Sequence, residues 1–140
     1  MNPNMSGILA PDGPIVASLR TRLDSVIAVY AFGSQVDGTA GPQSDLDLSV
    51  LVAGYADSLV LWELSSELAD ICHCPVDLLD LRAASTVMQS QVITTGQTLW
   101  SSGLDAGLFE CYVLSEKTAL DTARAPLMAG IAASGKIHAG

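Results

Sequence analysis

The chain has 140 residues, 49% of them hydrophobic, which suffices for one folded domain with its own core and is too short for two of ordinary size. Six Lys and Arg against 15 Asp and Glu give a formal charge of −9, which repels a phosphate backbone and disfavours stable nucleic-acid binding. The start carries no basic and apolar leader pattern, and no run of about 18 uncharged apolar residues occurs, so we expect a cytoplasmic protein without membrane association.

The first half of the chain has the pattern of one helix and two strands. Apolar residues recur every three or four positions from Ile15, which is typical of an amphipathic helix. The stretch Val26–Phe32 is β-branched and aromatic, as expected of a buried strand, and Gly33 ends it. The predicted segments are a loose arm over 1–12, a helix from 15 to a boundary within 24–27, a strand over 26–32, a loop over 35–44 and a strand over 46–52.

The second half alternates between helix and strand patterns without any repeat. Leu61, Leu64 and Leu68 recur at helical spacing, and Pro75 then forces the chain out of that helix. The predicted segments are a helix over 58–71, a strand over 76–81, a helix over 85–94, a strand over 97–101, a helix from 104 to about 131 and a mobile tail over 132–140. A single α/β domain spanning 1–140 accounts for all of them.

Two carboxylates stand at the start of the second predicted strand. Successive strand side chains point to opposite faces, so Asp45 and Asp47 share one face while Leu46 and Leu48 share the other. Two crowded carboxylates repel each other unless a cation lies between them, and Mg²⁺ is commonly held by one or two carboxylates together with phosphates. The pattern therefore predicts a site for magnesium and a nucleotide.

Three further residues complete this predicted site. Gly33 allows a polyphosphate to approach the backbone closely, and Ser34 offers it a backbone N–H and a hydroxyl. Asp77 lies on the third predicted strand, where it can accept a proton from an attacking hydroxyl. A general base typically accelerates a reaction by about 10²- to 10⁴-fold. Substrate positioning and metal electrostatics are expected to contribute more to the rate than this base does.

These residues resemble a known signature. Gly33-Ser34, ten intervening residues and Asp45-Leu46-Asp47 resemble the GS…DxD motif of the DNA polymerase β-like nucleotidyltransferases, most closely their minimal nucleotidyltransferase (MNT) branch. The stretch VDLLDL at 76–81 places Asp77 where the family has its third carboxylate. The similarity covers roughly residues 15–115.

The resemblance implies a fold, a site and a reaction. The fold is a small mixed β-sheet flanked by helices, and the reaction is adenylyl transfer from ATP with Mg²⁺ as cofactor. Asp45, Asp47 and Asp77 would bind the metal and act in catalysis, and Gly33 and Ser34 would bind the nucleotide. Bacterial MNT proteins of this size resemble the antitoxins of HEPN/MNT modules, which silence a HEPN ribonuclease toxin by transferring AMP to one of its tyrosines.

Two other functions stay open at this point. Many relatives carry arginines shortly after the serine, where Gln35 and Asp37 stand here, and neutral or acidic groups bind a triphosphate less well. The first alternative is an acidic MNT-fold protein with a vestigial nucleotide site that neutralises the toxin by binding and covering it. For either function, a homo-oligomer or a hetero-oligomer with the toxin stays open. Nucleotide transfer to a small hydroxylated molecule is the second, and the short chain argues against it, because such enzymes generally carry a further substrate-binding domain.

Several remaining residues are given structural roles. The stretch Cys72–Cys74 has a histidine at its centre, yet a structural zinc site needs about four ligands and the other histidine is His138 in the tail. Two reduced, partly buried thiols at a helix end are expected instead. Trp62 and Trp100 are expected to be half-buried in the core, with a role as partner anchors as the alternative, since aromatic residues are enriched at interfaces. Asp80 is expected to be a solvated or turn residue.

Overall fold

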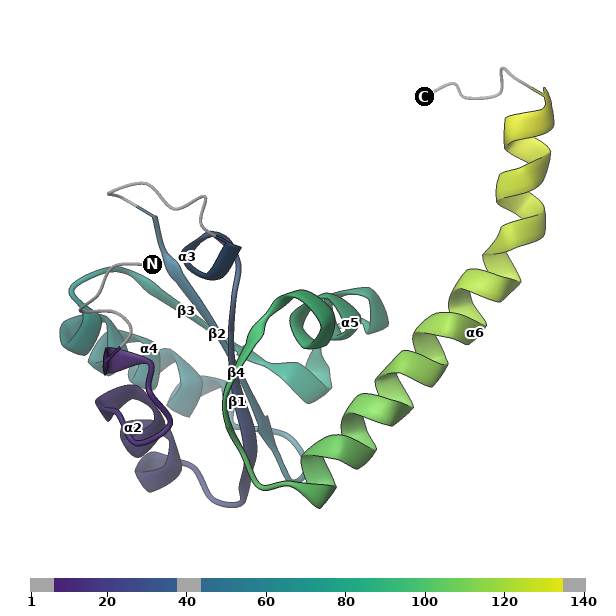
Figure 1. Ribbon diagram of the computed structural model, residues 1–140. Coiled ribbons are helices and arrows are strands. Elements are labelled where there is room, and N and C mark those ends of the chain that lie inside the picture. Colours follow the sequence, from purple (N-terminus) through teal and green to yellow (C-terminus); the bar gives the residue numbers. More distant parts are fainter. Residues whose placement is uncertain (1–6, 38–43, 135–140) are drawn as a thin grey trace.

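A four-stranded mixed sheet forms the centre of the molecule (Figure 1). The computed structural model describes residues 7–37 and 44–134. Within them the strand order is β3-β2-β1-β4; β1 pairs antiparallel with β2 and β4, and β2 pairs parallel with β3. The strands are β1 (Val26–Phe32), β2 (Leu46–Val52), β3 (Val76–Asp80) and β4 (Gln97–Ser101). The predicted strands and the predicted mixed sheet are confirmed.

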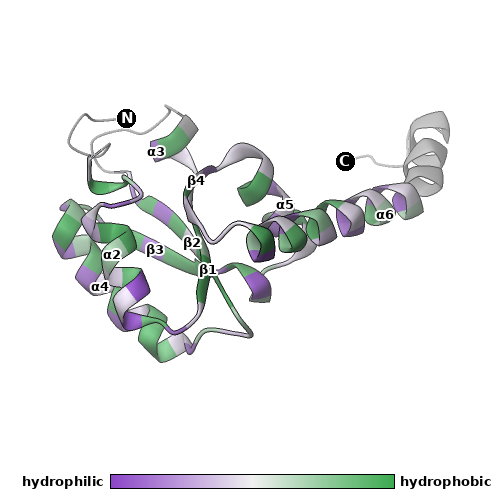
Figure 2. Cartoon of the chain, turned by 60° about the horizontal axis from the view of Figure 1, so that its bottom comes forward, coloured by the Kyte–Doolittle hydropathy of each residue, from purple (hydrophilic) through white to green (hydrophobic). Residues whose placement is uncertain are grey.

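Helices cover both faces of this sheet (Figure 1). On one face pack α2 (Pro14–Arg22) and α4 (Ser58–Cys72), and on the other α5 (Thr86–Thr95) and α6 (Leu104–Ser134). In both overall views α6 continues well beyond the sheet (Figures 1 and 2). All four correspond to predicted helices, with boundaries that differ by a few residues; α2 ends at Arg22, before the periodic pattern does.

Alternation along the strands divides the core into two clusters. Leu46, Leu48 and Val50 contribute to the cluster under α2 and α4. Tyr30 and Leu51 contribute to the smaller cluster under α5 and α6. Because a fully buried leucine contributes about 1.5–3 kcal/mol, these clusters provide most of the energy that holds the helices on the sheet.

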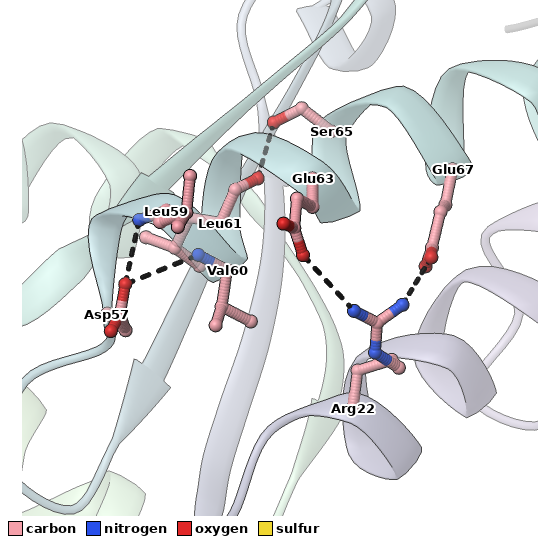
Figure 3. Close-up of polar contacts among 8 residues, drawn as sticks. All are labelled: Arg22, Asp57, Leu59, Val60, Leu61, Glu63, Ser65 and Glu67. Atoms are coloured by element: carbon pink, nitrogen blue, oxygen red, sulfur yellow. Dashed lines mark hydrogen bonds and ion pairs between the residues drawn. The ribbon is translucent and has the colours of Figure 1, made fainter.

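Polar contacts cap the start of α4 and join it to the end of α2 (Figure 3). Asp57 caps α4, its Oδ1 accepting from the N–H groups of Leu59 at 2.8 Å and Val60 at 3.4 Å. Arg22 at the end of α2 pairs with Glu63 and Glu67 of α4, and so joins the two helices. These pairs are exposed, so we expect them to contribute at most about 1 kcal/mol each.

Three segments differ from the sequence prediction. Ser34–Asp37 forms the short helix α3, begun by a Val36 N–H bond to the Gly33 carbonyl, whereas a loop was predicted there. The predicted third strand ends at Asp80, and Leu81–Ala83 forms the 3₁₀ helix η1. Leu9, in the predicted loose arm, is only 2% exposed and packs into the larger cluster. The rest of the predicted loop (38–43), the first six residues of the arm and the tail from 135 lie outside the described residues.

None of the helices in the described part of the chain is long and apolar enough to cross a membrane.

Candidate active site

Three carboxylates meet at one end of the sheet. In the parallel pair β2–β3, Asp47 lies opposite Asp77, and in the antiparallel pair β1–β2 it lies opposite Phe32. A hydrogen bond of 2.8 Å from the Leu46 N–H to the Pro75 carbonyl fixes this alignment at the start of both strands. Asp47 therefore stands between the end of β1 and Asp77, and Asp45 directly precedes β2, two residues before Asp47.

The charges of these groups act on one another. The pKa of Asp47 is raised above its usual value, first by burial and then by the negative charges of Asp77 and Asp45. Asp47 is half-buried, while Asp45 and Asp77 are exposed. Without a cation, the fully ionised cluster is thus electrostatically unfavourable at neutral pH.

The carboxylate cluster has the chemistry of a magnesium site. All its potential donors are hard carboxylate oxygens on neighbouring strands, which Mg²⁺ prefers, and a cation would relieve the repulsion that raises the Asp47 pKa. Within the described ranges, no three His, Cys, Asp or Glu side chains are already gathered as a group of metal ligands. The aspartates interact through charge, and coordination would require their side chains to turn toward a common point.

Gly33 lies against the central carboxylate. Its φ of +80° is in the left-handed region, which side-chain-bearing residues rarely adopt. A Cβ atom built at this position would collide with the Asp47 Oδ2. The glycine of the GS pair is thus required both by the turn and by the space that Asp47 occupies, and Ser34 follows at once as the first residue of α3.

Two neighbouring contacts were not anticipated from the sequence. The Gln35 side chain donates to the Ser44 carbonyl at 3.3 Å, which ties α3 to the residue before Asp45. A Cβ atom at Gly96, after α5, would lie 2.9 Å from the Ala31 carbonyl oxygen, so this helix end presses closely on β1. The only sequence signal was a glycine after a predicted helix, which indicates a helix end but not the surface it meets.

The thiols beside the site occupy the predicted position at a helix end. Cys72 is buried at the end of α4, Cys74 is half-buried, and their sulfur atoms are 3.3 Å apart. The pKa of Cys74 is raised to about 11, first by burial and then by Cys72 and Asp45. A thiol that holds its proton so firmly is a poor nucleophile, and we assign the pair to packing.

Two other expectations are corrected by the structure. Trp62 is 70% exposed on α4, so it is not a half-buried core residue, whereas Trp100 is half-buried beneath the Arg20 guanidinium. Asp80 is only 9% exposed and is not solvated. It does act in a turn, since its oxygens accept from the Ala56 N–H at 2.9 Å and the Arg82 N–H at 3.2 Å.

Comparison with known proteins agrees with this geometry. Residues 15–103 match the family described as polymerase beta, nucleotidyltransferase. The chain belongs to the polymerase beta nucleotidyltransferase family. It is 36% identical over 131 residues to the protein adenylyltransferase MntA of Shewanella oneidensis, an alignment that covers 92% of this chain and 94% of the relative. The predicted family and fold are confirmed.

Solved structures of this nucleotidyltransferase family are also similar. A chain from a toxin–antitoxin crystal structure with AMP-PNP superimposes with a TM-score of 0.75 and 37% identity, covering 84% of this chain and 94% of that one. A chain from a structure of the tri-AMPylated Shewanella oneidensis HEPN toxin in complex with the MNT antitoxin has a TM-score of 0.69 and 34% identity, covering 84% and 92%.

Proposed function

We propose that this nucleotidyltransferase is a protein adenylyltransferase antitoxin, which transfers AMP from ATP to a tyrosine of a HEPN ribonuclease toxin. The observation that carries the proposal is the placement of Gly33 against Asp47, with Asp77 next to it in the strand register. The similarity to MntA, and to chains from the AMP-PNP complex and the AMPylated toxin complex, supports the same reaction.

Some residues of the site bind the nucleotide and the metal, and Asp77 also acts on the acceptor hydroxyl. Gly33 and Ser34 hold the triphosphate at the end of β1, and Asp45, Asp47 and Asp77 would hold Mg²⁺. The metal would neutralise phosphate charge and stabilise the leaving pyrophosphate. Asp77 takes the proton from the tyrosine hydroxyl as its oxygen bonds to the α-phosphorus. The bond from that phosphorus to the bridging oxygen breaks, and pyrophosphate leaves.

A double substitution tests this function. We expect Asp45→Asn with Asp47→Asn to abolish AMP incorporation into the toxin, measured by intact mass after incubation with ATP and Mg²⁺. Asp24→Asn is the matched control, because Asp24 is an exposed carboxylate before β1, at the opposite end of that strand. Undiminished labelling by the double variant would rule out the assigned site.

The alternative of inhibition by binding alone also has an observation in its favour. The described arginines nearest the sheet are engaged elsewhere: Arg22 with Glu63 and Glu67, Arg82 with the Val52 carbonyl, and Arg20 with Trp100. A triphosphate at Gly33 would receive no bidentate help from them. If the double variant still neutralises the toxin at stoichiometric amounts, direct binding is the mechanism.

A further inference from the structure

A groove runs beside the carboxylate cluster, between α4 and β3. It has a volume of about 380 Å³ and is lined by residues of both elements. From α4 it takes Trp62, Ser66 and Ala69, which stand on one helix face at spacings of four and three residues. On the other side it is lined by Asp77 of β3 and by Pro75, the residue before that strand. Asp77 is thus shared by the groove and the candidate active site.

The reaction geometry indicates which substrate enters from this side. In phosphoryl transfer the attacking and leaving oxygens lie roughly in line through phosphorus. The triphosphate is assigned to Gly33 and Ser34, on the β1 side of Asp47, so the acceptor must approach from the opposite side, where Asp77 stands. In the described sheet β3 is the edge strand, and no further strand separates Asp77 from the groove.

Trp62 has the character of an interface anchor. At 70% exposure its indole contributes little to the core, while Leu61, Leu64 and Leu68 of the same helix are buried. Tryptophan is enriched among the few residues that dominate binding energy, because it buries a large surface with few rotatable bonds. An extended peptide along β3 could cover this indole and reach Asp77 with a neighbouring side chain.

We propose that this groove binds the segment of the toxin that carries the acceptor tyrosine, with Trp62 as its apolar anchor. The inference rests on the proposed function. Asp77 lines the groove and Asp47 lies across the β2–β3 pair from it, so the negative charge there favours a segment with basic residues near its tyrosine. The groove thereby selects the protein acceptor, a task separate from holding ATP.

Steady-state kinetics with the full-length toxin test the groove. We expect Trp62→Ala to lower kcat/KM for the toxin by about 10- to 30-fold, as the loss of a central anchor does, with KM for ATP within about twofold of wild type. Ser66→Arg, which fills the groove from an exposed position, should have a similar effect. Tyr55→Ala is the matched control: Tyr55 is an aromatic residue 72% exposed, beyond the opposite end of β2, and its loss should change neither parameter.

The outcomes separate this inference from the function on which it rests. If the wild-type chain transfers AMP and both groove variants keep its kcat/KM for the toxin, the groove proposal is wrong. An equal loss in Tyr55→Ala would also overturn it. If the wild-type chain transfers no AMP, the proposed function fails, and toxin affinity without nucleotide then decides on the groove. Weaker binding by Trp62→Ala would support it as a toxin-binding surface, and equal binding would contradict it.

Discussion

Asp77 lies directly across the β2–β3 pair from Asp47, in parallel register, although thirty residues separate them in the sequence. That register is fixed by backbone hydrogen bonds, including the one from Leu46 to Pro75, and not by any attraction between the two carboxylates, which repel each other. The fold therefore keeps two negatively charged carboxylates close to each other, although they would move apart if they were free. A cation between these carboxylates, as the proposed function requires, would relieve this repulsion.

Gly33→Ala is expected to abolish AMP transfer. The added Cβ meets the Asp47 carboxylate, and the left-handed φ costs about 1–2 kcal/mol for alanine. Gly54→Ala is the matched control, since Gly54 has a φ of +82° with no atom within 4 Å of a built Cβ. Both variants should lose stability in urea unfolding because of the left-handed φ, but only Gly33→Ala should lose activity. Equal activities in the two would show that contact with Asp47 is unimportant.

Asp47→Asn is expected to remove activity and to stabilise the fold at neutral pH. The folded pKa of Asp47 is raised, so the folded chain holds this proton more tightly than the unfolded chain does. That stabilising contribution is complete below the ordinary value of 3.8 and is lost as pH rises through the raised pKa. Because Asp47 is only half-buried, the gain should be below about 1 kcal/mol, which for a chain of this length corresponds to at most about 4 °C in Tm.

Thermal unfolding of Asp47→Asn between acid and neutral pH provides the measurement. The Tm advantage over wild type should grow as pH rises toward 7, measured without Mg²⁺. Asp24→Asn should show no such gap, since that carboxylate is exposed outside the cluster. A variant less stable than wild type at pH 7 would show that Asp47 makes a net favourable contact.

Asp80→Ala should destabilise the domain without changing its chemistry. Its two acceptor contacts hold the Ala56 and Arg82 N–H groups, at the opposite end of β3 from Asp77. Losing buried acceptors costs about 1–3 kcal/mol, measurable by urea unfolding, and Asp80→Asn should cost less because it keeps one acceptor oxygen. Transfer activity per folded molecule should stay at the wild-type level, and its loss without loss of stability would require a role in the site.

Gln35→Arg is expected to lower KM for ATP by about fivefold, because it adds a guanidinium beside the assigned triphosphate position. Gln35→Ala, which also removes the bond to the Ser44 carbonyl but adds no charge, serves as its control. Its KM for ATP should not fall. A fall of equal size in both variants would instead point to release of Ser44 as the cause.

Much of the fold could be predicted because it depends on local patterns. The alternation in Leu46–Val52 assigned each side chain to a face, and the buried cluster confirms that assignment. Asp80 shows the limit of local patterns. Alternation places its side chain on the same face as Leu78, which is buried, but the group that makes this burial possible, the Ala56 N–H, lies 24 residues away in the sequence. Such a partner, which makes burial of a carboxylate tolerable, leaves no mark on the local sequence.

The placement of Gly33 beside Asp47 was predictable for a similar reason, and the surroundings of the candidate site were not. Gly33, Asp45 and Asp47 are close in sequence, so their spacing reports their geometry. The exposure of Trp62 depends instead on where α4 sits across the sheet, and a tryptophan beside an apolar helix stripe is compatible with either face. The groove that it forms with β3 arises only in the packed molecule.

The most direct test of the account is the intact mass of the toxin after incubation with this chain, ATP and Mg²⁺. We expect the wild-type chain to increase the toxin mass by one or more AMP units, located on tyrosine by fragmentation, and the Asp45→Asn, Asp47→Asn variant to leave the mass unchanged. An unmodified toxin with the wild-type chain, or equal labelling by the double variant, would contradict it.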